Sequence, residues 1–151
     1  MIGLINKFVS ACSCLPDWLY TTIARFAVGF TFFHSGQSKV DDNYAVLGKT
    51  YSLFKDIYFA KVSLSDSIVN FFAFVATYAE LILPLLLFIG LASRFAALGL
   101  LIMTLVIQFV VFPDQFLTYK THGLWAVALL AILIKGPGPF SIDHLIKKKF
   151  S

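Results

Sequence analysis

The segment IVNFFAFVATYAELILPLLLFIGL, residues 68–91, decides the class of the fold. Its only charged residue is Glu80 and its only proline is Pro84. About 20 predominantly apolar residues cross a lipid bilayer as an α-helix. The segment therefore predicts a transmembrane helix, which the proline can kink.

The composition of the whole chain extends this prediction. Among the 151 residues, 59% are hydrophobic and 13% are charged, and the mean hydropathy is +0.85. A soluble domain carries roughly twice that share of charge. We therefore expect one domain, residues 1–151, whose main partner is the lipid bilayer. The net charge of +4 comes largely from Lys147–Lys149 beside the last apolar segment, so it does not predict a nucleic-acid partner.

Apolar length and loop spacing predict the fold class, an all-α membrane protein. The expected spans are residues 18–38, 68–91, 95–112 and 117–134, and short connections after the second and third favour an antiparallel four-helix transmembrane bundle. The first outer loop, residues 39–67, contains Tyr51, Phe54, Ile57 and Tyr58 at helical spacing. This spacing predicts a short amphipathic helix that caps the bundle, or else docks a partner.

Basic residues predict how the chain is oriented. With the C-terminal lysines inside, four spans place both termini in the cytoplasm. The inner side then carries six basic residues and the outer side carries five, which are balanced by aspartates in the outer loops. We therefore predict an inner (cytoplasmic) membrane protein with both ends inside.

Two ionisable residues lie within the predicted spans, Arg25 in the first and Glu80 in the second. Such residues are costly in lipid and usually face the bundle interior and pair. Counted at ~1.5 Å per residue, both lie roughly 10–12 Å from the cytoplasmic side. The sequence thus predicts a buried Arg25–Glu80 salt bridge, which either fixes the packing of the two helices or relays protons.

A second group of polar residues converges near the outer ends of the spans. His34, Gln108 and His122 come from three different spans, and Lys39, Asp114 and Lys120 lie at or beyond the boundary. Convergent polar groups at one level are how small-molecule sites are built. The alternative is that these groups are merely solvated at the interface. Two histidines without further ligands do not predict a metal site.

Several enzyme classes find no support in the sequence, because their motifs are missing. The chain has no glycine-rich phosphate loop, no Gly-x-Ser-x-Gly and no dinucleotide fingerprint. Cys12 and Cys14 form a Cys-x-Cys pair that can bind a soft metal or exchange thiols, or that simply precedes a helix. Redox chemistry in this chain would need a quinone, a metal or a partner subunit.

Several pieces together make the chain resemble the DoxX family of small four-span bacterial membrane proteins, from about Ile23 to Leu145. The matching pieces are Arg25, FHSGQSK (33–39), ELILP (80–84), GLASR (90–94), MTLVIQ (103–108), Pro113-Asp114, Thr121-His122, Trp125, GPG (136–138), Ser141 and Asp143. The family pattern in the first span is roughly aromatic-x-Ser-Gly-x-x-Lys. His34 fills a position that looks variable in the family.

The resemblance implies a fold more than a function. Relatives include a subunit of thiosulfate:quinone oxidoreductase and proteins associated with oxidant and thiol stress. The most similar branch is often encoded beside enzymes that build modified, copper-binding peptides. Together with the residue pattern, the resemblance favours a catalytic group of Arg25, Glu80 and His122 and a cofactor-binding group of Ser35, Gly36, Lys39, Gln108 and Asp114.

Two functions remain open at this point. One is a redox- or metal-stress-linked membrane subunit that binds a quinone in the outer polar layer, as part of an oxidoreductase. The other is a non-catalytic membrane partner or export accessory for a metal-binding peptide or a stress-response protein. The substrate, the role of the cysteines and whether the chain forms homo-oligomers are not determined by the sequence.

Overall fold

The computed structural model describes residues 3, 5–7, 10, 14–113 and 120–150. Its elements are α2 (Asp17–Gln37), α3 (Gly48–Leu53), the π-helix η1 (Phe54–Tyr58), α4 (Asp66–Ile89), α5 (Ser93–Val106), the π-helix η2 (Ile107–Val111), α6 (Lys120–Lys135) and α7 (Ile142–Phe150). Within the described residues the β-structure is limited to one isolated bridge, between Val40 and Val46. The predicted all-α class is confirmed.

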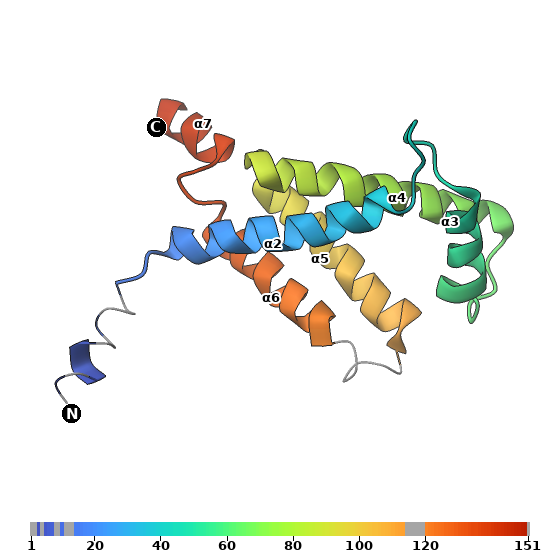
Figure 1. Ribbon diagram of the computed structural model, residues 1–151, viewed down its shortest axis with the longest axis horizontal. Helices are drawn as coiled ribbons and strands as arrows, with labels where there is room; N and C mark the ends of the chain where they lie inside the picture. Colours follow the sequence, from blue (N-terminus) through green and yellow to red (C-terminus); the bar gives the residue numbers. More distant parts are fainter. Residues whose placement is uncertain (1–2, 4, 8–9, 11–13, 114–119, 151) are drawn as a thin grey trace.

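The four long helices form an antiparallel bundle (Figure 1). Helix α2 packs against α4 and α6, and α5 packs against the same two helices. In Figure 1, α3 lies at one end of the bundle, and α7 and the start of α2 lie at the other. These are called the α3 end and the α7 end below.

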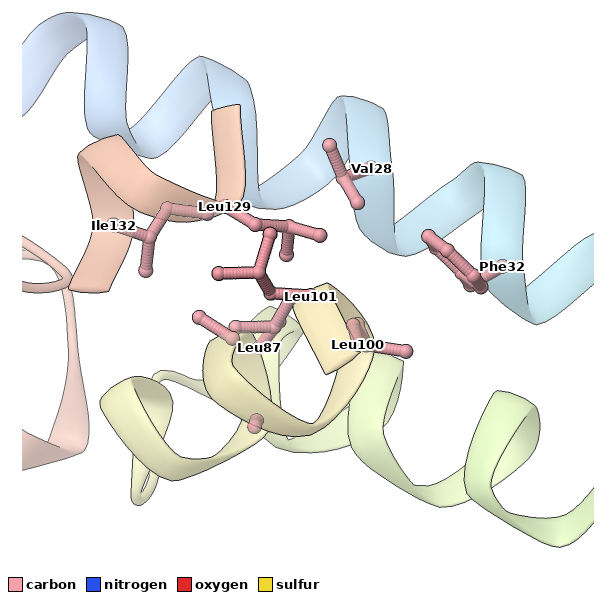
Figure 2. Packing of buried hydrophobic residues seen from close by; sticks show 9 residues of the cluster. Val28, Phe32, Leu87, Leu100, Leu101, Leu129 and Ile132 are labelled. Carbon is pink, nitrogen blue, oxygen red and sulfur yellow. The ribbon is translucent and has the colours of Figure 1, made fainter. Parts of the chain in front are cut away.

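The bundle core is apolar and draws on all four helices, as Figure 2 shows. Its labelled side chains are Val28, Phe32, Leu87, Leu100, Leu101, Leu129 and Ile132, each at most 8% exposed. Lipid tails are as apolar as leucine, so close packing rather than escape from water holds such helices together.

The outer surface of the bundle is also apolar. One large side chain from each long helix illustrates this: Phe30, Phe71, Phe95 and Val127 are 62–78% exposed. Among the described residues, Asp66–Ile89 and Ser93–Val111 are long and apolar enough to cross a bilayer, and Thr121–Lys135 is a shorter apolar helix. An apolar exterior of this extent is a lipid-facing surface, and the chain is an all-α membrane protein.

A glycine sets the register between α2 and α4. A Cβ atom at Gly36 would lie 3.0 Å from the backbone carbonyl carbon of Glu80, so the two helices touch there almost backbone to backbone. Gly36 lies in the last turn of α2, whereas Glu80 lies well inside α4. The first turns of α4 therefore continue past the end of α2.

The segment formed by α3 and η1 covers this protruding part of α4. Phe54 is 5% exposed and packs with Val69 and Ala73 of α4. Lys55 donates a 2.9 Å hydrogen bond to Asp66, and this bond and the charge of Asp66 raise the pKa of Lys55. The predicted loop helix is confirmed, and its aromatic face caps the bundle.

Candidate functional site

A buried ion pair lies at the point where α2 ends. Lys39 Nζ pairs with Glu80 Oε2 and also donates a hydrogen bond of 2.9 Å to Ser35 Oγ. Lys39 is 6% exposed and Glu80 is 4% exposed. The backbone carbonyl of Lys39 accepts a 3.0 Å hydrogen bond from Thr50 Oγ1, so α3 holds the lysine from the other side.

The predicted Arg25–Glu80 salt bridge is wrong. Depth counting assumed that α2 and α4 span the same layer from end to end, but α4 continues past the end of α2 at the α3 end. Glu80 therefore lies level with Gly36 rather than with Arg25. Lys39, which we expected at or beyond the membrane boundary, is its partner instead.

Arg25 has a different role at the α7 end, where it is fully buried. Its guanidinium donates to the carbonyls of Leu87 (2.9 Å) and Phe88 (3.1 Å) in the last turn of α4. It also donates to the carbonyls of Pro137 (2.7 Å) and Phe140 (3.1 Å), which follow α6. Helix C-termini leave carbonyls without partners, so Arg25 joins one helix end to the segment before α7.

An apolar cleft of about 250 Å³ opens beside Glu80, between α4, α5 and the two π-helices. Glu80 is the one charged residue among its described lining residues. The walls hold four aromatic side chains, Phe54, Tyr58, Phe59 and Phe72. Val75, Ile102 and Val106 also line the cleft and are 45–54% exposed, so the cleft opens on the lipid-facing surface.

A second, more polar cavity of about 370 Å³ lies on the lysine side of the ion pair. It is lined by Ser35, Ser38, Lys39, Lys49, Thr50, Leu53 and Tyr58. Tyr58 lines both cavities, and the Lys39–Glu80 pair contributes one residue to each. The pair therefore stands between an apolar cleft and a polar pocket.

Gln108 and His122 form a second buried polar pair. His122 Nδ1 lies 2.8 Å from Gln108 Oε1, and Gln108 Nε2 donates to the Phe112 carbonyl at 3.1 Å. The two residues are 5% and 6% exposed. The expected approach of span three to span four is confirmed for this pair. Neither residue lines the cleft, although Ile107 and Val111 on either side of Gln108 do.

The remaining predicted residues divide into two groups. Ser35 and Gly36 lie beside the ion pair, as a hydrogen-bond acceptor and as the helix contact. His34 is exposed. Asp114, the side chain of Lys120 and Cys12 lie outside the described residues, and Cys14 is exposed. The structure thus brings together Ser35, Gly36, Lys39 and Glu80, and separately Gln108 with His122.

Sequence reasoning missed the aromatic wall. The sequence pattern places Phe54 and Tyr58 on the apolar face of the loop helix, but it does not indicate that both line a cleft beside Glu80. Both lie in η1, and the cleft also touches η2. Short π-helical turns are frequent at functional sites. Their only signal in the sequence is the aromatic spacing, which does not distinguish a π-helix from an α-helix.

Comparisons with known proteins identify the family and one relative. The DoxX family model matches residues 20–113. An uncharacterized protein of Haemophilus influenzae is 31% identical over 133 residues, which cover 85% of this chain and 83% of that protein. No solved structure matches the chain significantly.

Proposed function

The chain belongs to the DoxX family, and from this premise we propose that it is a membrane subunit that binds a quinone in the cleft beside Glu80. It would serve a redox-linked complex of the bacterial inner membrane. Both termini would face the cytoplasm, so that the α3 end and the quinone headgroup lie in the outer half of the bilayer. Residues 1–151 would act as one domain.

One observation carries this proposal: a single buried ion pair ends an otherwise apolar and aromatic cleft. Ionisable residues at membrane depth usually mark substrate paths or proton relays. Small-molecule sites are mostly apolar, with a few polar groups that fix the orientation of the ligand. The cleft has this composition.

The cleft residues fit a quinone in shape and in chemistry. A volume of about 250 Å³ suits a substituted ring rather than a drug-sized molecule. Aromatic side chains favour offset or edge-to-face contact with a planar ring. The isoprenoid tail would leave through the exposed mouth into lipid. Among the cleft residues, the Tyr58 hydroxyl can donate to a ring carbonyl oxygen, whereas Lys39 lies behind Glu80 in the polar pocket.

The residues of the chain would bind and orient the ring and handle protons. A bound quinone supplies redox chemistry, with electrons delivered by a partner redox protein. The Tyr58 hydroxyl would donate a hydrogen bond to a ring carbonyl, and Glu80 would exchange a proton with the polar pocket through Lys39 and Ser35. Gln108 and His122 would act by position, because they anchor the η2 turn whose Ile107 and Val111 form part of the wall.

Binding of a short-tailed quinone to the purified full chain tests the proposal. Decyl-ubiquinone, titrated in detergent micelles and followed by tryptophan quenching, should bind saturably to the wild type. Ala79→Leu fills the cleft and should weaken binding at least tenfold. Ala27→Leu adds the same volume at an exposed site on α2, outside the cleft.

The outcomes separate a site from nonspecific partitioning. The proposal predicts unchanged affinity for Ala27→Leu and lost saturation for Ala79→Leu. Quenching that rises linearly with quinone, or that is equal in all three proteins, would contradict a specific site. Affinity unchanged in both Ala79→Leu and Glu80→Gln would place any quinone elsewhere.

The alternative role, a docking accessory for a peptide or stress-response protein, depended on the loop helix as a contact surface. In the structure the aromatic face of that helix packs onto α4. The aromatic side chains that would contact a docked partner are thus used to cover α4, and the structure adds no support for the docking role.

A further inference from the structure

Helix α7 (Ile142–Phe150) presents an apolar face that has no partner among the described residues. Ile142, Leu145, Ile146 and Phe150 recur at helical spacing and are 38–81% exposed. Lys147, Lys148 and Lys149 lie beside this face in the last turns of the helix. A short helix with an apolar stripe and adjacent lysines lies in the plane of a membrane surface.

A pocket of about 460 Å³ lies between α7, the start of α5 and the segment that follows α6. Four of its lining residues are basic or can become so: Arg94, Lys135, His144 and Lys147. The one acidic lining residue is Asp143. Its Oδ1 and Oδ2 already accept hydrogen bonds from the backbone N–H groups of Ala92 (2.7 Å) and Ser93 (2.8 Å).

The basic groups in the pocket keep capacity for an anion. Among the described residues, Arg94 makes one long hydrogen bond, 3.4 Å to the carbonyl of Ile134, and no ion pair. Lys147 has no ion pair within the described part of the chain either. Lys135 pairs with Asp17 at 2.7 Å, but both side chains are at least half exposed, and such pairs exchange with solvent.

Aromatic residues mark this level as a membrane interface. Trp18 and Phe140 meet edge to face, with ring centroids 5.3 Å apart, beside the pocket. Phe140 is 68% exposed and Trp18 is 37% exposed. Tryptophan is enriched where lipid tails meet headgroups. Because α7 follows the last long helix after only a few residues, it must lie at this boundary too.

We propose that this pocket binds the headgroup phosphate of an anionic phospholipid, with α7 lying in the interface beside it. Arg94 and Lys147 would contact the phosphate, and the apolar stripe of α7 would cover the adjacent acyl chains. The site is at the opposite end of the bundle from the Glu80 cleft. It does not depend on the quinone proposal or on the orientation of the chain.

Native mass spectrometry of the full chain, released from nanodiscs with equal amounts of phosphatidylglycerol and phosphatidylcholine, tests the site. The wild type should retain phosphatidylglycerol in preference to phosphatidylcholine. The double variant Arg94→Gln/Lys147→Gln should retain about 25-fold less phosphatidylglycerol. Each cation near a membrane surface contributes about fivefold to the binding of an anionic lipid, and the variant loses two. Inorganic phosphate at millimolar concentration should not displace the lipid.

The matched control is Lys148→Gln/Lys149→Gln, which removes the same charge from α7 outside the pocket lining. It should retain phosphatidylglycerol nearly as well as the wild type. Equal losses in both double variants would reduce the effect to surface charge and overturn the pocket. Absence of lipid preference, or phosphate retained in place of lipid, would overturn it as well. If circular dichroism shows that the variant with Arg94→Gln unfolds at a lower temperature than the wild type, the single variants Lys147→Gln and Lys148→Gln are compared instead. Lys147→Gln should then lose more phosphatidylglycerol than Lys148→Gln.

Discussion

At the scale of single residues, Glu80 has two different surroundings. On one side, Lys39 and Ser35 form a hydrogen-bonded chain that leads to a polar pocket. On the other side, aromatic side chains line an apolar cleft. A buried charge without its partner is very costly, so the contact with Lys39 is what lets Glu80 be buried beside the cleft.

Removal of either member of this pair should strongly destabilise the protein. We expect Lys39→Met or Glu80→Gln to cost about 3–5 kcal/mol, because each leaves a buried group unpaired. The double variant should recover much of this loss. Thermal or SDS-induced unfolding in mixed micelles measures all four proteins of the cycle.

The exposed pair Lys55–Asp66 provides the control cycle. Its side chains are 55% and 68% exposed, so water and salt screen the attraction and the coupling should be close to zero. Equal coupling in the two cycles would mean that the Lys39–Glu80 pair is not buried as described.

Arg25 should contribute stability rather than ligand binding. Its four carbonyl contacts join α4 to the segment before α7. Since a hydrogen bond to a charged group is worth about 1.5–3 kcal/mol, Arg25→Gln should lower the unfolding free energy by several kcal/mol. Quinone affinity should remain within about twofold. Arg94→Gln, which loses one long bond, should change stability little.

At the scale of helices, the register of α2 against α4 depends on Gly36. A methyl group there would lie 3.0 Å from the backbone of Glu80 and from the side chain of Leu81. We expect Gly36→Ala to cost about 1–3 kcal/mol, as overpacking usually does. Unfolding in micelles measures the cost, and quinone titration should show a weaker site.

Gly123 in α6 is the matched glycine, since nothing lies within 4 Å of a Cβ atom placed there. Gly123→Ala should be neutral or stabilise the helix by up to about 1 kcal/mol. If the two substitutions had the same effect, close contact at Gly36 would not set the register.

The helices were largely predictable from the sequence, but their relative register was not. Apolar length located residues 68–91 to within two residues of α4, because lipid requires long apolar helices. Counting from each helix start then misplaced Glu80 next to Arg25. The error came from the turns of α4 that extend beyond α2, where Phe54 packs on Val69 and Ala73.

At the scale of the whole molecule, polar residues occupy two ends of an apolar bundle. The sequence named Ser35, Gly36, Lys39 and Glu80 as candidate site residues, but it placed Glu80 with Arg25 rather than with the other three. It did not predict the cleft, because a cavity depends on which side chains leave space between helices. The π-helices η1 and η2, which line it, have no sequence signature either.

The orientation predicts different accessibility of the two ends. In a Cys12→Ser/Cys14→Ser background, Asp42→Cys in the loop before α3 should react with a membrane-impermeant maleimide on intact cells. Lys148→Cys on α7 should react only after permeabilisation, since both termini are predicted inside. The reverse pattern would invert the topology and move the cleft to the cytoplasmic half of the bilayer.

The most direct test of the quinone site is photolabelling of membranes that contain the full chain with an azidoquinone, followed by peptide mapping. The quinone proposal predicts adducts in 54–59 and 72–80, removed by excess unreactive quinone and absent from Ala79→Leu. Adducts that excess quinone does not remove, or competed adducts confined to the residues around His122, would contradict a quinone site beside Glu80.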